Sequence, residues 1–200
     1  MQIYILFVIQ QLIASSTHIF AKNVVMTMHP VNVVFYRGAF SVLLYGAWLW
    51  WQKTDTTPIA RADWKRYLWL GLVNMPLNQL MFVWGLRYTT PANASLAYAL
   101  SPAFVALLGA LFFGERLGKN MLLGICIAFA GTSIVLFEKG IATSPEYLLG
   151  NAIELCASLS WSLYTVLGRS LSLQYGAIRT TGISMLTGFA MFAVVTLLAP

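Results

Sequence analysis

Seven runs of about 20 mostly apolar residues fill nearly the whole chain, and this feature constrains the fold more than any other. A helix needs roughly 20 such residues to cross the ~30 Å hydrocarbon core of a bilayer. The runs cover residues 3–22, 31–51, 66–86, 91–113, 121–137, 148–168 and 181–199. The connections between them are short, so no separate soluble domain fits there. The sequence therefore predicts an all-α membrane protein whose bundle of transmembrane helices carries any activity.

Composition supports this prediction and excludes other classes. Hydrophobic residues make up 59% of the chain and charged residues only 9%, whereas a soluble protein averages roughly 25% charged residues. The excess of 12 Lys and Arg over 6 Asp and Glu is typical of cytoplasmic loops rather than of nucleic-acid binding. Cys126 and Cys156 fall inside apolar runs, so we expect no metal site and no cofactor. The predicted environment is a lipid bilayer, with no nucleic acid as partner.

The distribution of basic residues predicts the orientation of the bundle. With a cytoplasmic N-terminus, eight basic residues lie in inside loops: Lys53, Arg61, Lys65, Arg66, Arg116, Lys119, Arg169 and Arg179. The outside loops then hold Lys22, Arg87 and Lys139. We therefore expect a multi-pass protein of the cell (cytoplasmic) membrane with its N-terminus in the cytoplasm.

Residues 88–117 carry an ordered series of motifs, YTTPANASLAYALSPAFVALLGALFFGERL. An opening Tyr-Thr-Thr is followed by a Ser-Pro at the centre of an Ala-rich helix and by a closing Gly-Glu-Arg-Leu. Further motifs are His29-Pro30 with Arg37, and Trp161-Ser162-Leu163-Tyr164 with Arg169. In this series the chain resembles the EamA-type family of the drug/metabolite transporter superfamily.

The resemblance implies ten helices in two five-helix repeats. An odd number of spans per repeat places the second copy upside down, which gives an inverted-repeat transporter architecture. This chain would supply the first EamA-like repeat in residues 1–139 and the start of the second, helices six and seven, in residues 140–200. About three further helices are then expected outside it, so that the chain is a fragment of a ten-helix protein or an incomplete second repeat.

The resemblance also implies a secondary transporter, an exporter or exchanger of small metabolites that works by alternating access. The chain has no GxxxxGK[ST] motif for phosphate binding, and its two His lack partners for catalysis, so we expect no enzyme. A seven-helix receptor or sensor without transport activity is the alternative. Small residues at four-residue spacing, such as Ser95, Ala99 and Ala103, indicate close helix packing or, alternatively, a homodimer face.

Two charged residues fall inside apolar runs, where an ionisable group costs on the order of 2.5–3.5 kcal/mol and marks a functional candidate. Arg37 and Glu154 lie about seven and six residues into runs that start on the same side of the membrane. Arg37 is either structural or a substrate-binding residue, because a guanidinium can bind a carboxylate. For Glu154 an ion pair with Arg37, a role in transport coupling and a solvated interfacial position all remain open.

The other candidates are uncharged or weakly basic. His18, near the end of the first run, could relay protons or be an ordinary interfacial histidine. Asn74 and Asn78 flank Pro76, and with Tyr98 and Trp161 they are candidates for a substrate-binding cavity, the alternative being interhelical hydrogen bonds and packing. Pro76 and Pro102 lie well inside their runs, so we expect both helices to be interrupted or bent there.

Overall fold

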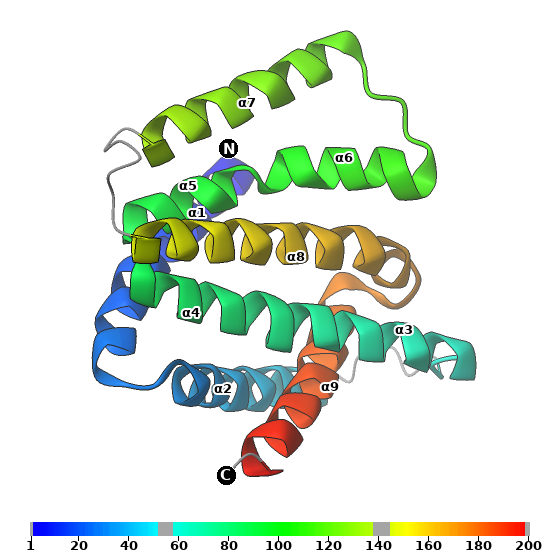
Figure 1. The fold of residues 1–200 in the computed structure, drawn as a ribbon. Helices are drawn as coiled ribbons and strands as arrows, with labels where there is room; N and C mark the ends of the chain where they lie inside the picture. Colours follow the sequence, from blue (N-terminus) through cyan, green and yellow to red (C-terminus); the bar gives the residue numbers. More distant parts are fainter. Residues whose placement is uncertain (1, 52–57, 138–144, 199–200) are drawn as a thin grey trace.

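The computed structural model describes residues 2–51, 58–137 and 145–198, and within these residues every predicted run is helical (Figure 1). The elements are α1 (Gln2–Thr27), α2 (Pro30–Trp51), α3 (Arg61–Leu72), η1 (Val73–Gln79), α4 (Leu80–Tyr88), α5 (Pro91–Ala99), α6 (Ser101–Phe113), α7 (Lys119–Phe137), α8 (Pro145–Tyr175) and α9 (Ala177–Leu198). The predicted helical membrane bundle is confirmed.

Four helices of the described part are long and apolar enough to cross a membrane: Tyr4–Thr27, Pro30–Trp51, Pro91–Phe113 and Ala177–Thr196. Among the other runs, α8 is 31 residues long but less apolar on average. Its buried positions explain the difference, because they include Asn151, Glu154, Ser158 and Ser162. These four polar residues of α8 therefore face the interior of the bundle, whereas Glu146 and Arg169 of the same helix are exposed.

The two interior prolines interrupt their helices, as predicted. Pro76 lies within η1, a stretch of π-helix that joins α3 to α4. Pro102 follows the break at Leu100, which separates α5 from α6. A proline ring removes one hydrogen-bond donor and clashes with the preceding turn, so the chain widens or breaks there. Helix starts follow the same chemistry, since Pro91 opens α5 and the Thr90 side chain accepts a hydrogen bond from the Asn93 amide at 3.2 Å.

Helix α8 lies at the centre of the bundle, with α4, α5 and α6 packed along it, while α9 crosses α2 and α3 steeply (Figure 1). Two glycines allow the α3–α9 crossing. A Cβ atom on Gly188 would lie 2.5 Å from the Gly71 carbonyl oxygen, and one on Gly71 would lie 2.5 Å from the Gly188 amide nitrogen. The backbones of the two helices therefore touch, and this contact fixes α9 against the first part of the chain.

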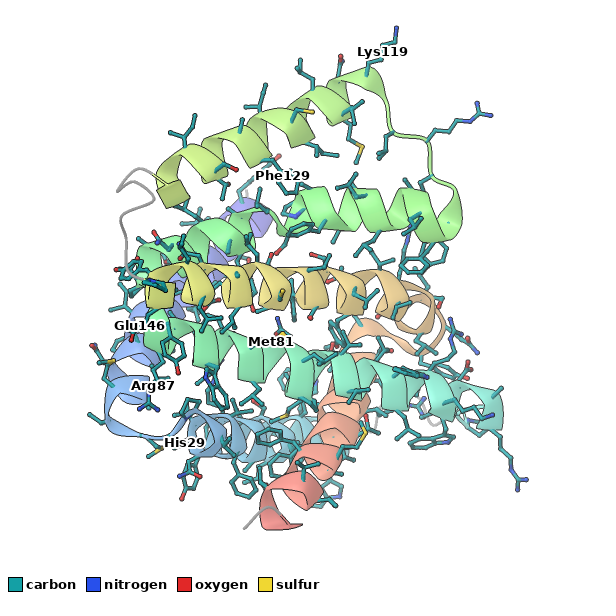
Figure 2. All side chains as sticks on the ribbon, in the orientation of Figure 1. His29, Met81, Arg87, Lys119, Phe129 and Glu146 are labelled. Atoms are coloured by element: carbon teal, nitrogen blue, oxygen red, sulfur yellow. The ribbon has the colours of Figure 1, made fainter. Side chains whose placement is uncertain are left out.

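The loops between successive helices lie at two opposite ends of the bundle. Figure 2 shows His29, Arg87 and Glu146 at one end, here called the His29 end, and Lys119 at the opposite end, here called the Lys119 end. This alternation matches the predicted order of the loops. Lys53, Lys139 and the predicted repeat boundary at 139 and 140 lie outside the described residues.

Lys22 is not a loop residue, in contrast to the prediction. It lies in the last part of α1, and its Nζ donates to the carbonyl oxygens of Leu86 at 2.7 Å, Arg87 at 3.3 Å and Thr89 at 2.9 Å. These carbonyls end α4, where a cation is favoured by the helix dipole. Lys22 therefore ties α1 to α4 at the His29 end.

Candidate functional site

Tyr98 of α5 is the centre of a polar layer in the half of the bundle nearer the His29 end. Its hydroxyl accepts a hydrogen bond at 2.7 Å from Nδ2 of Asn78, which also donates to the Ala157 carbonyl at 2.8 Å. Its ring meets the ring of Phe82 edge-on, with centroids 5.5 Å apart, and the imidazole of His18 at 5.8 Å. Tyr98 thus joins α1, η1, α4, α5 and α8.

Arg37 reaches the layer from α2. Its guanidinium lies over the ring of Phe82, 5.6 Å from the centroid, in the geometry of a cation–π contact. Its Nη1 is buried without a hydrogen-bond partner. An Arg held on an aromatic face with a free, buried donor can accept an anionic group without breaking any other contact. Arg37 can therefore bind a carboxylate.

Glu154 of α8 is completely buried, and neither carboxylate oxygen has a hydrogen-bond partner. Its side chain packs on Gly85 of α4, where an added Cβ would lie 2.8 Å from Oε1. The ion pair with Arg37 that was one interpretation of the sequence is not formed, and a solvated interfacial position is also wrong. Instead, Glu154 and Arg37 approach Tyr98 separately, from α8 and α2.

Unsatisfied polar atoms gather in this layer. Among the described residues, five buried side-chain atoms lack a partner: His18 Nε2, Arg37 Nη1, Asn74 Oδ1 and both oxygens of Glu154. Each buried polar atom left unpaired costs about 1–3 kcal/mol. Such groups in a native protein indicate strain, a functional role or a bound water or ion, and their gathering in one region makes it the candidate site. We call His18, Arg37, Asn74, Asn78, Tyr98 and Glu154 the polar layer.

The structure brings six of the seven candidate residues to this layer. Asn74 lies one turn before Asn78 and is fully buried, and its Nδ2 donates to Met185 Sδ of α9 at 3.5 Å. His18 is half-buried, and its Nδ1 lies 3.1 Å from the Ala14 carbonyl oxygen. Trp161 is different. It lies two turns beyond Glu154 along α8, stacks on Tyr164 with ring centroids 5.5 Å apart, and is 38% exposed.

Phe82 is the residue of this site that sequence reasoning missed. Its ring contacts His18 at 5.2 Å, Tyr98 at 5.5 Å and the Arg37 guanidinium at 5.6 Å. A signal was present, because Phe82 lies four residues after Asn78 and so shares its helix face. An aromatic residue in an apolar run is nevertheless usually a packing residue, which is why the spacing alone did not single it out.

A neutral network closes the layer on the side of the His29 end. The Thr89 hydroxyl donates to Oδ1 of Asn151 at 2.5 Å, and Nδ2 of Asn93 donates to the same oxygen at 3.1 Å. Close packing accompanies it, since a Cβ on Gly150 would lie 2.8 Å from the Thr89 amide nitrogen. These contacts join α5 and the end of α4 to α8, so a path from this end into the layer requires them to separate.

At the Lys119 end two carboxylates, Asp63 and Glu115, are paired with arginines. Asp63 accepts hydrogen bonds from the Tyr175 hydroxyl at 2.8 Å and from Arg66 Nη1 at 3.1 Å. Tyr175, with Arg66, holds the pKa of the Asp63 carboxyl below its usual range. Arg169 of α8 forms a second ion pair with Glu115 at 2.5 Å. We call Asp63, Arg66, Tyr175, Glu115 and Arg169 the charged clasp, because it ties α8 to the start of α3 and to the loop after α6.

Comparisons with known proteins identify relatives that are named transporters or exporters. An uncharacterized transporter of Archaeoglobus fulgidus is 30% identical over 174 residues, covering 86% of this chain and 59% of the relative. The uncharacterized transporter YyaM of Bacillus subtilis is 33% identical over 134 residues, covering 66% of this chain and 44% of the relative. A protein of Streptantibioticus cattleyicolor named "Probable terminal-alkyne amino-acid exporter" is 28% identical over 118 residues, covering 59% of this chain and 39% of the relative.

The chain spans about half the length of the curated relatives it matches. No solved structure matches it significantly. The sequence model of the EamA-like transporter family matches residues 1–137, more than half of the chain. Its motifs, its helical bundle and these matches agree, and the chain belongs to the EamA-like transporter family.

Proposed function

We propose that this chain is part of a secondary transporter that exports or exchanges a small metabolite across the cytoplasmic membrane by alternating access. Membership of a transporter family and the names of its relatives support the general activity. The polar layer is the proposed substrate site. In this proposal two inverted repeats, the first in residues 1–139, enclose the layer, and Asn78 and Tyr98 orient the substrate.

One observation carries the assignment of the site. All five unpartnered buried side-chain atoms of the described residues lie on four residues, and these come from α1, α2, η1 and α8. Apolar packing does not require four helices to turn unsatisfied polar atoms toward the same part of a membrane bundle. A polar substrate that bonds to these atoms would offset their desolvation, and its departure would restore the cost, as reversible transport requires.

The distribution of charge supports a cytoplasmic N-terminus. The Lys119 end holds Arg61, Lys65, Arg66, Arg116, Lys119, Arg169 and Arg179, whereas the His29 end holds Lys22 and Arg87. Basic residues favour the cytoplasmic side. In this orientation the polar layer lies about 9–14 Å from the outer surface, counted along the helices at about 1.5 Å per residue, and the charged clasp closes the cytoplasmic end. A homodimer is compatible with this arrangement.

The test is metabolite profiling of cells that overproduce the full-length protein, beside cells that produce an Arg37→Ala variant at the same level in the membrane. Amino acids belong in the first panel, because one relative is named an amino-acid exporter. We expect at least one metabolite to change its distribution across the membrane with the wild-type protein and not with the variant. A protein that changes no distribution, yet binds a metabolite, would favour the receptor or sensor alternative.

A further inference from the structure

Arg37 lines two separate hollows. The first, here called the α1–α2 groove, has a volume of about 370 Å³ and is almost entirely apolar. Its walls include Phe20, Ala21 and Val24 of α1, Met28 of the turn after α1, and Val33 of α2. A volume of this size lies within the range of roughly 300–1,000 Å³ that is typical of small-molecule sites. The groove can therefore hold a hydrocarbon group of substantial size.

The second hollow, here called the Arg37 pocket, lies on the other side of Arg37, between α2, η1 and α9, and has a volume of about 100 Å³. It is more polar, because Ser41 and Gln79 line it together with Arg37. Serine and glutamine side chains can both donate hydrogen bonds to an oxygen anion. The Arg37 pocket has room for a small head group and no room for a long chain.

Within the described residues, the Arg37 guanidinium forms no ion pair. Its Nη1 is buried without a hydrogen-bond partner, Glu154 does not pair with it, and the guanidinium lies over the ring of Phe82. A buried guanidinium binds a carboxylate through two parallel hydrogen bonds more favourably than it binds a neutral acceptor. The Arg37 guanidinium is therefore suited to bind an anionic group.

We propose that the ligand of this site is a carboxylate with an apolar tail, whose head group binds the Arg37 guanidinium where it borders the α1–α2 groove, while its tail lies in that groove. This inference rests on the proposed function and names its substrate class. Phe20 and Tyr36 border the groove and are 69% and 62% exposed. In the described part of the chain the groove is therefore open between α1 and α2, where the tail can enter.

The experiment uses the purified full-length protein in nanodiscs of zwitterionic phosphatidylcholine and straight-chain carboxylates from butyrate to decanoate as probes. Val24→Trp fills the groove from a position that is 40% exposed. Val8→Trp places the same ring at a position of α1 that is 59% exposed and outside the groove. Longer carboxylates also partition into the bilayer. The test therefore compares how binding depends on chain length in Val24→Trp and in Val8→Trp. Val24→Phe replaces Val24→Trp if the latter does not fold.

We expect the affinity of the wild-type protein and of Val8→Trp to rise by up to about fourfold per methylene, and to level off when the groove is full. Val24→Trp should abolish that rise while leaving the affinity for butyrate within about twofold. Arg37→Gln should weaken binding of every probe by a similar factor, about tenfold or more. Equal chain-length dependence in Val24→Trp and Val8→Trp would overturn the proposal.

A second measurement separates a free carboxylate from a lipid head group. Native mass spectrometry of the purified protein would reveal an anionic phospholipid that both Arg37→Gln and Val24→Trp release, and this result would replace the proposed ligand by a lipid. The results that contradict the ligand class differ from those that contradict the proposed function. If an efflux that depends on Arg37 is found but no carboxylate binds, the transporter assignment stands and the ligand class is wrong, whereas absence of any such efflux contradicts the transporter assignment itself.

Discussion

The polar layer and the charged clasp each contain an arginine and a glutamate, but only those of the clasp form an ion pair. In the clasp, Asp63 is bonded to Tyr175 and Arg66, and Glu115 is paired with Arg169. In the layer, Arg37 and Glu154 each keep buried atoms without a partner. Paired charges near an aqueous surface hold helices together at little cost, while unpaired charges in an apolar interior destabilise the fold. The difference separates a contact that closes the bundle from a site that awaits a ligand.

The largest expected effect tests which side of the membrane each region faces. Cys126 and Cys156 are replaced by Ser, and single cysteines are introduced as His29→Cys or Lys119→Cys at the two ends of the bundle (Figure 2). A membrane-impermeant thiol reagent should label His29→Cys on intact cells and should label Lys119→Cys only after the membrane is opened. The reverse pattern would place the polar layer in the cytoplasmic half and the clasp outside.

The next effect compares one carboxylate from each region. Glu154→Gln should lower transport on the order of tenfold to a hundredfold without lowering the thermal unfolding midpoint, because the buried carboxylate makes no bond that the amide would lose. Glu115→Gln is the matched control. It should leave transport within about twofold and reduce stability by no more than about 1 kcal/mol, as its ion pair is exposed. If Glu154→Gln lowers the midpoint more than Glu115→Gln does, Glu154 has a structural partner and the contrast between the regions fails.

A smaller effect concerns the distance between the two charges of the layer. Because Arg37 and Glu154 form no ion pair, the stability changes of Arg37→Gln and Glu154→Gln should add in the double variant to within about 0.5 kcal/mol. Unfolding in detergent, followed for both single variants and the double variant, provides the measurement. A coupling energy clearly above that limit would show that the residues meet in another conformation of the protein.

The smallest effect lies in the clasp and depends on pH. The pKa of Asp63 is lowered in the folded protein, first by the Tyr175 hydroxyl and then by Arg66. A lowered folded-state pKa stabilises the fold above the ordinary pKa of about 3.9. That contribution is lost as the pH falls through the folded value. Tyr175→Phe should therefore lower the unfolding midpoint at about pH 6, and its difference from the wild type should shrink toward about pH 3. A difference that does not change with pH would exclude the carboxylate as the cause.

Much of the fold followed from short-range features of the chain. Each apolar run became helical, and Pro76 and Pro102 interrupted their helices where a ring without a donor must do so. The candidate site was also visible in part, because any polar side chain in a membrane run needs a reason to be there. Arg37, Glu154, His18 and Asn74 were found on that ground alone.

Long-range pairing was decided only by the tertiary structure. Tyr175 meets Asp63 across 112 residues, and Lys22 binds the carbonyls at the end of α4 instead of lying in a loop. The face that a helix turns to its neighbour depends on the rotation of the helix and on the crossing angle. Close contacts such as that between Gly71 and Gly188 fix both the rotation and the angle. Hydropathy and local stereochemistry act within a few residues, so the sequence determined the helices and their polar residues. The sequence placed Arg37 and Glu154 at a similar depth, and helix packing decided that they remain unpaired.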